Sequence, residues 1–479
     1  MGSLRKPVVA FLMIGALLSV AVALSRLPGR RVFDRATPTR AVDRPLPAPP
    51  ARTAGAGAPR IPNQRIATRK TLRCLQALCE TGASDAAVSQ TRGLLAQLDA
   101  APRLPAPRLP VLLRGVLSCL SPHPSAGALH AAPGIPRDLL DRAAAACDAR
   151  GRRKPSEVVL SFAGDCTFGT VNGDGGPARF PSVYRRSGRA DYPFALVRPW
   201  LLNDDLSVVN FECTLTDAVP IADKQWHFKG PARYAAIFPA SSVEAVGLSN
   251  NHSHDYLQAG FRDTVANFTR AHVPVFYQNV PCVTTLRGVE TVIIGDCTVV
   301  GENTTAIGEA PQRVVGEIRR YKKPGNIVVV VMHWGSELDA VPRPWQQKMG
   351  RGFIDAGADA VVGAHPHVVQ GIERYKGKYI AYSLGNFAFG GNSLARYPET
   401  FILRLRFHAG GGQTRVAGAS IVPCWTTSER TRNGAGVLRN NYQPRPVFGK
   451  TADQTAALVL ARSAGLKYGV KELEYLRLR

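Results

Sequence analysis

Runs of apolar, mostly β-branched residues alternate with amphipathic segments from residue 156 onward. Continuous apolar runs of this kind are typical of strands that are buried on both faces, with helices covering the sheet. The runs occupy 157–165, 205–212, 243–252, 273–277, 291–295, 327–335, 359–367 and 378–386. The pattern therefore predicts an α/β fold.

The segments between and beyond these runs predict helices and a hairpin. Leu257, Phe261, Val265 and Phe268 recur on one helical face, and Asp255 precedes them as the expected N-cap. At the C-terminal end we predict a hairpin of 401–407 with 416–425, a helix over 452–466 and a short helix over 470–479.

An apolar run of 17 uncharged residues, from Val8 to Leu24, follows Arg5 and Lys6. This length suits a spanning helix at its lower limit or the apolar part of a signal peptide. We predict that residues 1–25 anchor the chain in a membrane with its bulk on the extracytoplasmic side. Cleavage of the segment is an open alternative.

Composition changes again after this run. Residues 26–70 are rich in Pro, Ala and Arg without apolar periodicity, which predicts an extended basic linker. Residues 71–150 show apolar spacings of three and four, which predicts a small helical domain. The main domain is then expected at 156–426, with a C-terminal extension at 427–479 that packs on it.

The formal net charge of +25 favours polyanionic partners. Residues 1–70 hold 13 lysines and arginines against two aspartates, so part of this charge lies in the linker. Because no zinc-finger, RRM or helix-turn-helix pattern accompanies the charge, we expect no nucleic-acid partner and favour an acidic polymer or a membrane surface.

The nine cysteines include no CxxC pair, so a structural zinc site is not indicated. Two interpretations stay open. In an oxidising compartment Cys282 and Cys297 are the best candidates for a disulfide. Otherwise the cysteines are buried thiols that pack as small apolar side chains.

Polar side chains recur where the predicted strands end. In layered α/β folds the ligand site lies beyond the carboxyl ends of the strands, so these side chains are expected to converge. Carboxylate, amide and imidazole groups together can hold one or two divalent cations, such as Mn, Fe, Zn or Mg. The predicted metal ligands are Asp165, Glu212, Asn251, His333, His365 and His367.

His252 follows the predicted ligand Asn251 and is expected to contact the substrate as general acid or oxyanion stabiliser. A metal-bound water would be the nucleophile. His227, Lys229 and Asn386 are further candidates for substrate binding.

Six segments together resemble a known family, the CapA proteins of bacterial poly-γ-glutamate capsule synthesis. They are GDCTFG, NFECTLT, NNHSHDY, HWGSE, GAHPHVVQG and SLGNF, in this order over about 156–392. That family in turn resembles the calcineurin-like metallophosphoesterases. The resemblance implies a four-layer α/β/β/α sandwich and a membrane-anchored protein that acts on an anionic γ-linked polyglutamate, with capsule synthase or export subunits as partners.

The resemblance also implies roles for single residues. Glu212 stands at the position of the bridging carboxylate, and Asn251 with His252 matches the Asn-His pair of the phosphoesterases. Thr167 occupies a position where the phosphoesterases carry histidine, so one metal site loses a nitrogen donor. Two functions therefore remain: a metal-dependent hydrolase, or a membrane-tethered component of a capsule synthase that binds a polyanion without turnover.

Overall fold

The computed structural model describes residues 156–171, 176–219, 221–299 and 310–475. The predicted membrane segment 1–25, the linker 26–70 and the helical segment 71–150 lie outside these residues. Among the helices of the described part, none is both long and apolar enough to cross a bilayer.

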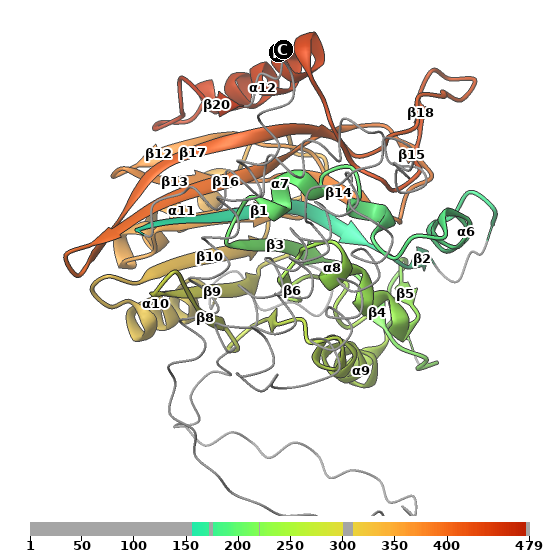
Figure 1. The fold of residues 1–479 in the computed structure, drawn as a ribbon, viewed down its shortest axis with the longest axis horizontal. Coiled ribbons are helices and arrows are strands. Elements are labelled where there is room, and N and C mark those ends of the chain that lie inside the picture. The colour runs from blue at the N-terminus through green and yellow to red at the C-terminus, as the bar shows by residue number, and fades with distance from the viewer. Residues whose placement is uncertain (1–155, 172–175, 220, 300–309, 476–479) are drawn as a thin grey trace, which may run out of the picture.

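Two β-sheets form the centre of the domain (Figure 1). The larger contains, in spatial order, β19 (Arg445–Pro446), β17 (Gln413–Trp425), β16 (Glu399–Gly410), β1 (Glu157–Thr167), β3 (Leu206–Phe211), β6 (Ala245–Gly247) and β7 (Val275–Phe276), while β14 (Asn386–Phe389) pairs with β1 and β20 (Glu474–Tyr475) with β17. The smaller contains β12 (Ile372–Tyr375), β13 (Lys378–Ala381), β11 (Ala360–Ala364), β10 (Ile327–His333), β9 (Val289–Cys297) and β8 (Cys282–Leu286).

The strands that carry the predicted site run parallel within each sheet. β1 pairs in parallel with β3, and β3 with β6. In the smaller sheet β10 lies between its parallel neighbours β9 and β11. The carboxyl ends of these strands therefore meet at one edge of each sheet.

Alternation along the strands explains why both sheets are covered on both faces. On β10, Val329 and Val331 belong to the core between the two sheets, whereas Val328 and Val330 face the outer helices. On β3, Val208 likewise faces the core between the sheets. Side chains of a strand alternate between faces, so a continuous apolar run fills both cores.

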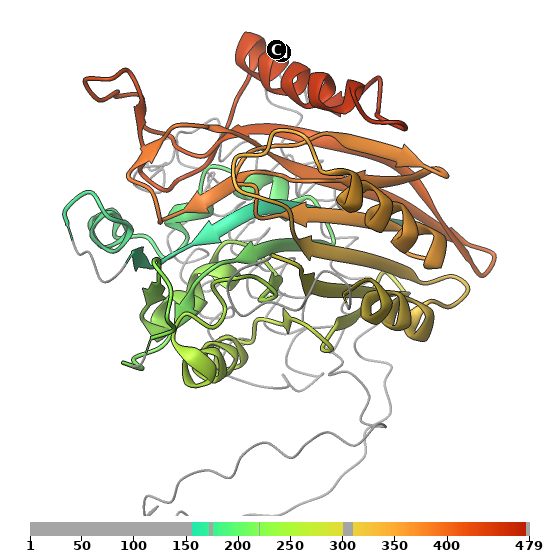
Figure 2. The same ribbon diagram turned by 180° about the vertical axis from the view of Figure 1, so that it is seen from behind.

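Helices cover the outer faces. α10 (Ala310–Tyr321) and α11 (Pro344–Ala356) pack on the smaller sheet through Ile318 and Phe353, and Figure 2 shows both in front of its strands. The larger sheet is covered by α7 (Arg198–Leu202), α8 (Ile237–Ala240) and α9 (Leu257–Arg270), through Trp200, Phe238 and Phe268. The layers are thus α/β/β/α, and the predicted α/β class is confirmed.

Smaller elements complete the described residues. They are α6 (Phe180–Ser187), two short 3-10 helices (Tyr192–Phe194 and Ala232–Ala236), the small sheet of β2 (Thr170–Val171), β5 (Phe228–Gly230) and β4 (Thr214–Leu215), and the pair β15 (Leu394–Ala395) with β18 (Leu438–Arg439).

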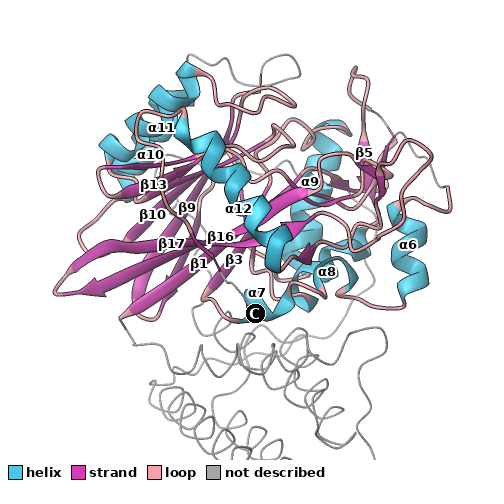
Figure 3. Cartoon of the chain, turned by 90° about the horizontal axis from the view of Figure 1, so that it is seen from above, coloured by secondary structure: helices cyan, strands magenta, loops and turns pink. Residues whose placement is uncertain are grey.

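The C-terminal part joins the domain. The predicted hairpin is present as β16 and β17, and α12 (Gly449–Ala464) crosses the strands from above in Figure 3. α12 contacts β17 of one sheet and β12 of the other, and Val459 enters the core between them. The prediction of a short helix at 470–479 is wrong for its described part, 470–475, because Glu474 and Tyr475 form β20 and pair with Ser420 and Ile421. Pairing with an existing strand satisfies their backbone groups, which overrides the local helical pattern.

The cysteines of the described residues are all free, so the candidate disulfide between Cys282 and Cys297 is not formed. Cys282 lies at the start of β8 opposite Ile293, whereas Cys297 ends β9 opposite His333. The register of the two strands therefore separates the sulfurs. Among the described cysteines the alternative of buried thiols is correct for Cys166, Cys213, Cys282 and Cys424, whereas Cys297 is half-buried.

Candidate metal centre

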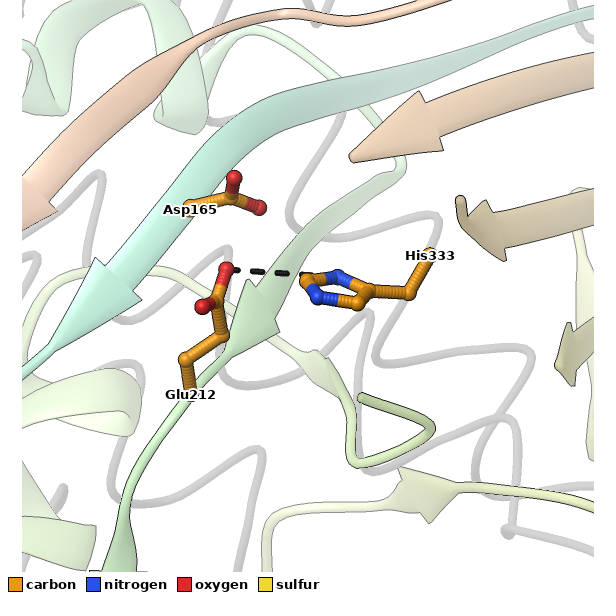
Figure 4. A group of neighbouring side chains, drawn as sticks. All are labelled: Asp165, Glu212 and His333. Carbon is orange, nitrogen blue, oxygen red and sulfur yellow. Dashed lines mark ion pairs between the residues drawn. The ribbon is translucent and has the colours of Figure 1, made fainter. Parts of the chain in front are cut away.

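Three side chains from three strand ends meet between the sheets. Asp165 lies near the end of β1, Glu212 directly follows β3 and His333 ends β10. One ligand atom from each lies within 4.8 Å of the other two, and Figure 4 shows the side chains pointing toward one another. All three are at most 1% exposed. This is a compact, buried set of oxygen and nitrogen donors.

Asn210, on β3, holds this set together. Its Nδ2 amide lies 2.8 Å from Asp165 Oδ1 and 3.1 Å from Glu212 Oε1. The same nitrogen lies 3.2 Å from Nδ1 of His333. Asn210 Oδ1 in turn accepts a hydrogen bond from Asn250 at 3.1 Å. Both carboxylates thus receive a hydrogen bond from one amide, which fixes their separation.

The other predicted ligands join the same cluster. Asn251 Oδ1 lies 2.9 Å from His333 Nε2. The rings of His333 and His365 have centroids 4.7 Å apart. His367 Nδ1 lies 3.3 Å from Asp165 Oδ2, and its Nε2 lies 3.9 Å from Glu212 Oε2. The structure therefore brings all six predicted metal ligands together.

The loop after β11 presents its two histidines with unusual backbone angles. His365 has φ of 96° and His367 has φ of 57°, a region that non-glycine residues rarely adopt. The backbone N–H of His365 donates to Asp165 Oδ2 at 3.0 Å, which ties this loop to the larger sheet. Asn386 Oδ1 lies 2.8 Å from His367 Nδ1 and orients the ring.

The two carboxylates titrate in opposite directions. Burial and the charge of Asp165 raise the pKa of Glu212 well above its usual value. Burial also acts to raise the pKa of Asp165, but the hydrogen bond and charge of His367 outweigh it and hold this pKa below its usual value. Two carboxylates this close cannot both ionise easily without a cation.

The pKa values of the three histidines also shift in different directions. Burial and the charge of His367 lower the pKa of His365 to about 3. Burial and the neighbouring His365 lower the pKa of His333 well below its usual range. Desolvation also acts on the half-buried His367, but its hydrogen bond to Asp165 raises its pKa. His333 and His365 are therefore neutral near pH 7, the form that binds metal ions.

The cluster contains two buried atoms that no hydrogen bond satisfies. Within the described residues, Glu212 Oε2 and His365 Nδ1 have no hydrogen-bond partner, and His367 Nε2 lies 3.9 Å from Glu212 Oε2. Leaving a buried polar atom unpaired costs about 1–3 kcal/mol. A cation would satisfy an anionic oxygen and an imidazole nitrogen together, so these residues fit a divalent metal ion.

His252 lies beside this cluster in a hydrogen-bonded group of its own. Its Nδ1 lies 2.9 Å from Asp255 Oδ2, so Nδ1–H donates to the carboxylate. Lys224 Nζ forms an ion pair with Asp255 at 2.8 Å and donates to the carbonyl of Asn251 at the same distance. Burial lowers the pKa of His252 although Asp255 acts against it. The expected N-cap role of Asp255 is wrong, because α9 begins only at Leu257 and the carboxylate serves His252, Lys224 and the N–H of Phe228.

The candidate substrate residues lie in different surroundings. His227 is buried, and its Nε2 lies 2.7 Å from the carbonyl of Ala222. Lys229 Nζ donates to the carbonyl of Ala218 at 3.0 Å and lies 4.5 Å from the ring centre of Tyr256. Asn386 alone contacts a cluster residue, His367. Their role in substrate binding stays a prediction.

Residues 159–391 match the family model described as "Bacterial capsule synthesis protein PGA_cap". The capsule biosynthesis protein CapA of Bacillus anthracis is 32% identical over 265 residues, which cover 50% of this chain and 61% of that protein. The PGA biosynthesis protein CapA of Bacillus subtilis (strain 168) is 31% identical over 248 residues, which cover 48% of this chain and 65% of that protein.

The domain at 159–391 belongs to the CapA family. Its matched part spans less than two thirds of the length of either Bacillus relative. Among solved structures, the calcineurin-like phosphoesterase YfkN from Bacillus subtilis has a TM-score of 0.34 and 12% sequence identity, covering 64% of this chain and 96% of that one.

Thr167 has a structural role in this CapA-family domain. Its hydroxyl donates to the backbone carbonyl of Glu212 at 2.9 Å, and the side chain is fully buried. The N–H of Glu212 in turn donates to the carbonyl of Cys166 at 2.8 Å. Thr167 therefore fixes the backbone that carries Glu212.

Two members of the site were missed by the sequence analysis. Asn210 lies two residues before Glu212, and the alternation of side chains along a strand was a signal that the two share a face. Lys224 had no such signal, because it lies in the loop before β5 and reaches Asp255 from a distant segment.

Proposed function

We propose that the CapA-family domain holds one or two divalent cations and hydrolyses a bond in the metabolism of an anionic polymer of the poly-γ-glutamate type. Manganese, iron, zinc and magnesium all suit a mixed oxygen and nitrogen donor set. The observation that carries the proposal is the convergence of two carboxylates and three histidines in which Glu212 Oε2 and His365 Nδ1 are buried without a hydrogen-bond partner. The name of the Bacillus subtilis relative, PGA biosynthesis protein CapA, supports the choice of polymer, and the name of the Bacillus anthracis relative supports a role in capsule synthesis.

The residues of the cluster and their neighbours have different proposed roles, as metal ligands or as residues that position the ligands. Asp165, Glu212, Asn251, His333, His365 and His367 would hold the metal. A bound divalent cation supplies Lewis acidity and lowers the pKa of a coordinated water. Asn210 keeps the carboxylates in place, and Asn386 orients His367.

His252 is the proposed proton-transfer residue. Asp255 holds the proton on Nδ1, which leaves Nε2 as the ring nitrogen that accepts a proton and returns it to the leaving group. The buried carboxylate of Asp255 stabilises the imidazolium that forms in between. Lys224 fixes Asp255 and the backbone of Asn251 in the same arrangement.

The N-terminal segment completes the proposal. The apolar run from Val8 to Leu24 supports a membrane anchor with the domain on the extracytoplasmic side, next to capsule synthase or export subunits. A second candidate is a tethered component that binds the polymer without turnover. It is favoured by Thr167, which stands where a histidine ligand is expected and whose hydroxyl is bonded to the backbone of Glu212.

The test compares turnover of the metal-loaded full chain on γ-glutamyl and phosphodiester substrates with that of two variants. His252→Ala is expected to lower kcat by about 10²–10⁴-fold, and His365→Ala to lower metal content and turnover together. His408→Ala is the matched control, since His408 pairs with Glu157 at the far end of β1. Metal binding by the wild type without turnover on any substrate would contradict the hydrolase and support the binding component.

A further inference from the structure

Five arginines gather on a small part of the domain beyond residue 391, where the family match ends. Four of them lie on or beside β15 and β18, and the fifth is on β19 at the edge of the larger sheet. This arginine lobe consists of Arg396, Arg430, Arg432, Arg439 and Arg445. Residues 427–445 contain only one acidic residue, Glu429.

Backbone pairing places these arginines close together. Arg439 lies opposite Leu394, two residues before Arg396, and Arg432 bridges to Leu438. Arg445 lies opposite Trp425 in the sheet, and its guanidinium lies 5.0 Å from the centre of that ring. These pairings place the arginines on neighbouring strands and loops in one part of the domain.

The charge of the arginine lobe is not neutralised. Within the described residues, none of its five arginines forms an ion pair. Glu429 Oε1 accepts the backbone N–H groups of Arg430 and Thr431 at 2.9 and 3.0 Å. Elsewhere buried carboxylates pair with arginine, as in Arg313–Asp296 at 2.7 Å and Arg287–Asp205 at 2.9 Å. Arg432 donates to the carbonyl of Gly436 at 2.6 Å, a neutral acceptor that does not cancel its charge. Guanidinium groups without a carboxylate partner are available to an external anion.

Hydrogen bonds join the segment that carries Arg439 to residues 389–392, which reach the metal centre. Asn440, next to Arg439, donates to the carbonyls of Phe389 and Asn392 at 3.1 and 2.8 Å. The ring of Phe389 lies 4.9 Å from that of His367. Figure 1 shows β15 and β18 at the end of the larger sheet toward which β1 points. Phe389 therefore contacts His367, a predicted ligand, with its ring and Asn440, the neighbour of Arg439, with its carbonyl.

We infer that the arginine lobe binds the carboxylates of an extended anionic polymer while the bond to be cleaved lies at the metal centre. This inference rests on the proposed function and names how its substrate is held. A γ-linked glutamate chain carries a carboxylate on every residue, and the arginine fork matches a carboxylate through two parallel hydrogen bonds. A lobe outside the family match would then extend the substrate site in this chain.

The experiment measures binding of a fluorescent oligo-γ-glutamate to the detergent-purified full chain. The test variant combines Arg430→Glu, Arg432→Glu and Arg439→Glu, three exposed positions. The control combines Arg319→Glu, Arg320→Glu and Arg415→Glu, which are also exposed. Arg415 pairs with His408, and the two arginines of α10 precede the start of β10, so all three lie away from the strand ends that form the site.

We expect the test variant to weaken binding by about tenfold or more and the control by less than about twofold, since exposed charges each contribute up to about 1 kcal/mol. Binding by the wild type should weaken as salt is added. If charge reversal impairs folding, the same positions are changed to glutamine instead. The glutamine variant should lose less affinity than the glutamate variant, but still more than the control.

Equal losses in test and control variants, or no loss in the test variant, would overturn the inference. Equally tight binding of single-stranded DNA with the same number of charges would also overturn it, because the lobe would then not select carboxylates. His333→Ala separates this result from the proposed function: it should abolish turnover while the oligo-γ-glutamate still binds.

Discussion

The two sheets contribute to the metal centre in different ways. The larger sheet supplies carboxylates from within or directly beside regular strands, and Asn210 bonds both of them. The smaller sheet supplies histidines, two of them from a loop with positive φ angles. The carboxylate side is thus held by strand geometry. The histidine side depends on a strained loop that is tied to the larger sheet by the hydrogen bond from His365 N–H to Asp165 and by the contacts of His367 with Asp165 and Asn386.

The two sheets join where Gly164 and Asp165 of β1 meet Gly385, a contact here called the seam, and this contact makes the arrangement possible. After β13 the chain crosses to the larger sheet, where Asp165 N–H donates to the carbonyl of Gly385 at 3.0 Å. A Cβ on Gly164 would lie 1.9 Å from that carbonyl oxygen, and Gly385 has φ of 75°. The metal centre therefore depends on the way the two sheets join at the seam, because one sheet supplies the carboxylates and the other the histidines.

The largest expected effect follows from filling the seam. Gly164→Ala should destabilise the protein by about 3 kcal/mol or more, because the new methyl group meets backbone that cannot yield. Chemical denaturation measures the loss. Gly352→Ala is the control, since a Cβ there meets nothing within 4 Å and the residue lies in α11, so a gain of about 0.5–1 kcal/mol is expected. Equal stability of both variants would contradict the role of the seam.

A smaller effect is expected from the carboxylate side. Asn210→Ala removes the donor that Asp165 and Glu212 share, and should cost about 1–3 kcal/mol in stability and about 10–100-fold in metal affinity. Calorimetric titration with Mn²⁺ or Zn²⁺ measures the affinity. Asn392→Ala, at an exposed asparagine, should change neither quantity. Unchanged metal affinity in Asn210→Ala would show that the carboxylates are held by other means.

On the histidine side, the stability of glycine and alanine variants should depend on the backbone angle at the substituted position. At His365 glycine relieves the positive φ and alanine does not, so His365→Gly should be more stable than His365→Ala by about 1 kcal/mol. At His333, within the regular strand β10, the order should reverse, with glycine about 0.5–1 kcal/mol less stable. The midpoints of thermal unfolding of these four variants give the order. The same order of stability at both positions would contradict the claim that the loop carrying His365 is strained.

The smallest effect concerns Glu317 on the outer face of the smaller sheet. Burial and Asp296 raise the pKa of Glu317 from 4.5 to about 7. The folded state therefore holds this proton more tightly, and the stability that it contributes below pH 4.5 is lost as pH rises toward 7. Glu317→Gln should thus gain stability relative to wild type between pH 5 and pH 8. A constant difference across these pH values would contradict the raised pKa.

The sequence predicted the strands and the convergence of their ends because both follow from apolar runs. It named Asp165 and His333 for the same reason, as polar residues at the ends of such runs. It could not find Lys224, whose partner Asp255 is 31 positions away in a separate loop. It also assigned Asp255 to helix capping, because a local pattern does not reveal that His252 and Lys224 compete for the same carboxylate.

The central claim is that residues from both sheets form one metal centre, and metal stoichiometry tests it most directly. Mass spectrometry of the purified full chain, after loading and removal of excess ions, should find one or two divalent cations per chain. A variant that combines Asp165→Asn, Glu212→Gln and His333→Ala should bind no divalent cation. The control variant His408→Ala should bind as many cations per chain as the wild type. Equal metal content in the triple variant, with an unchanged circular dichroism spectrum, would contradict the account.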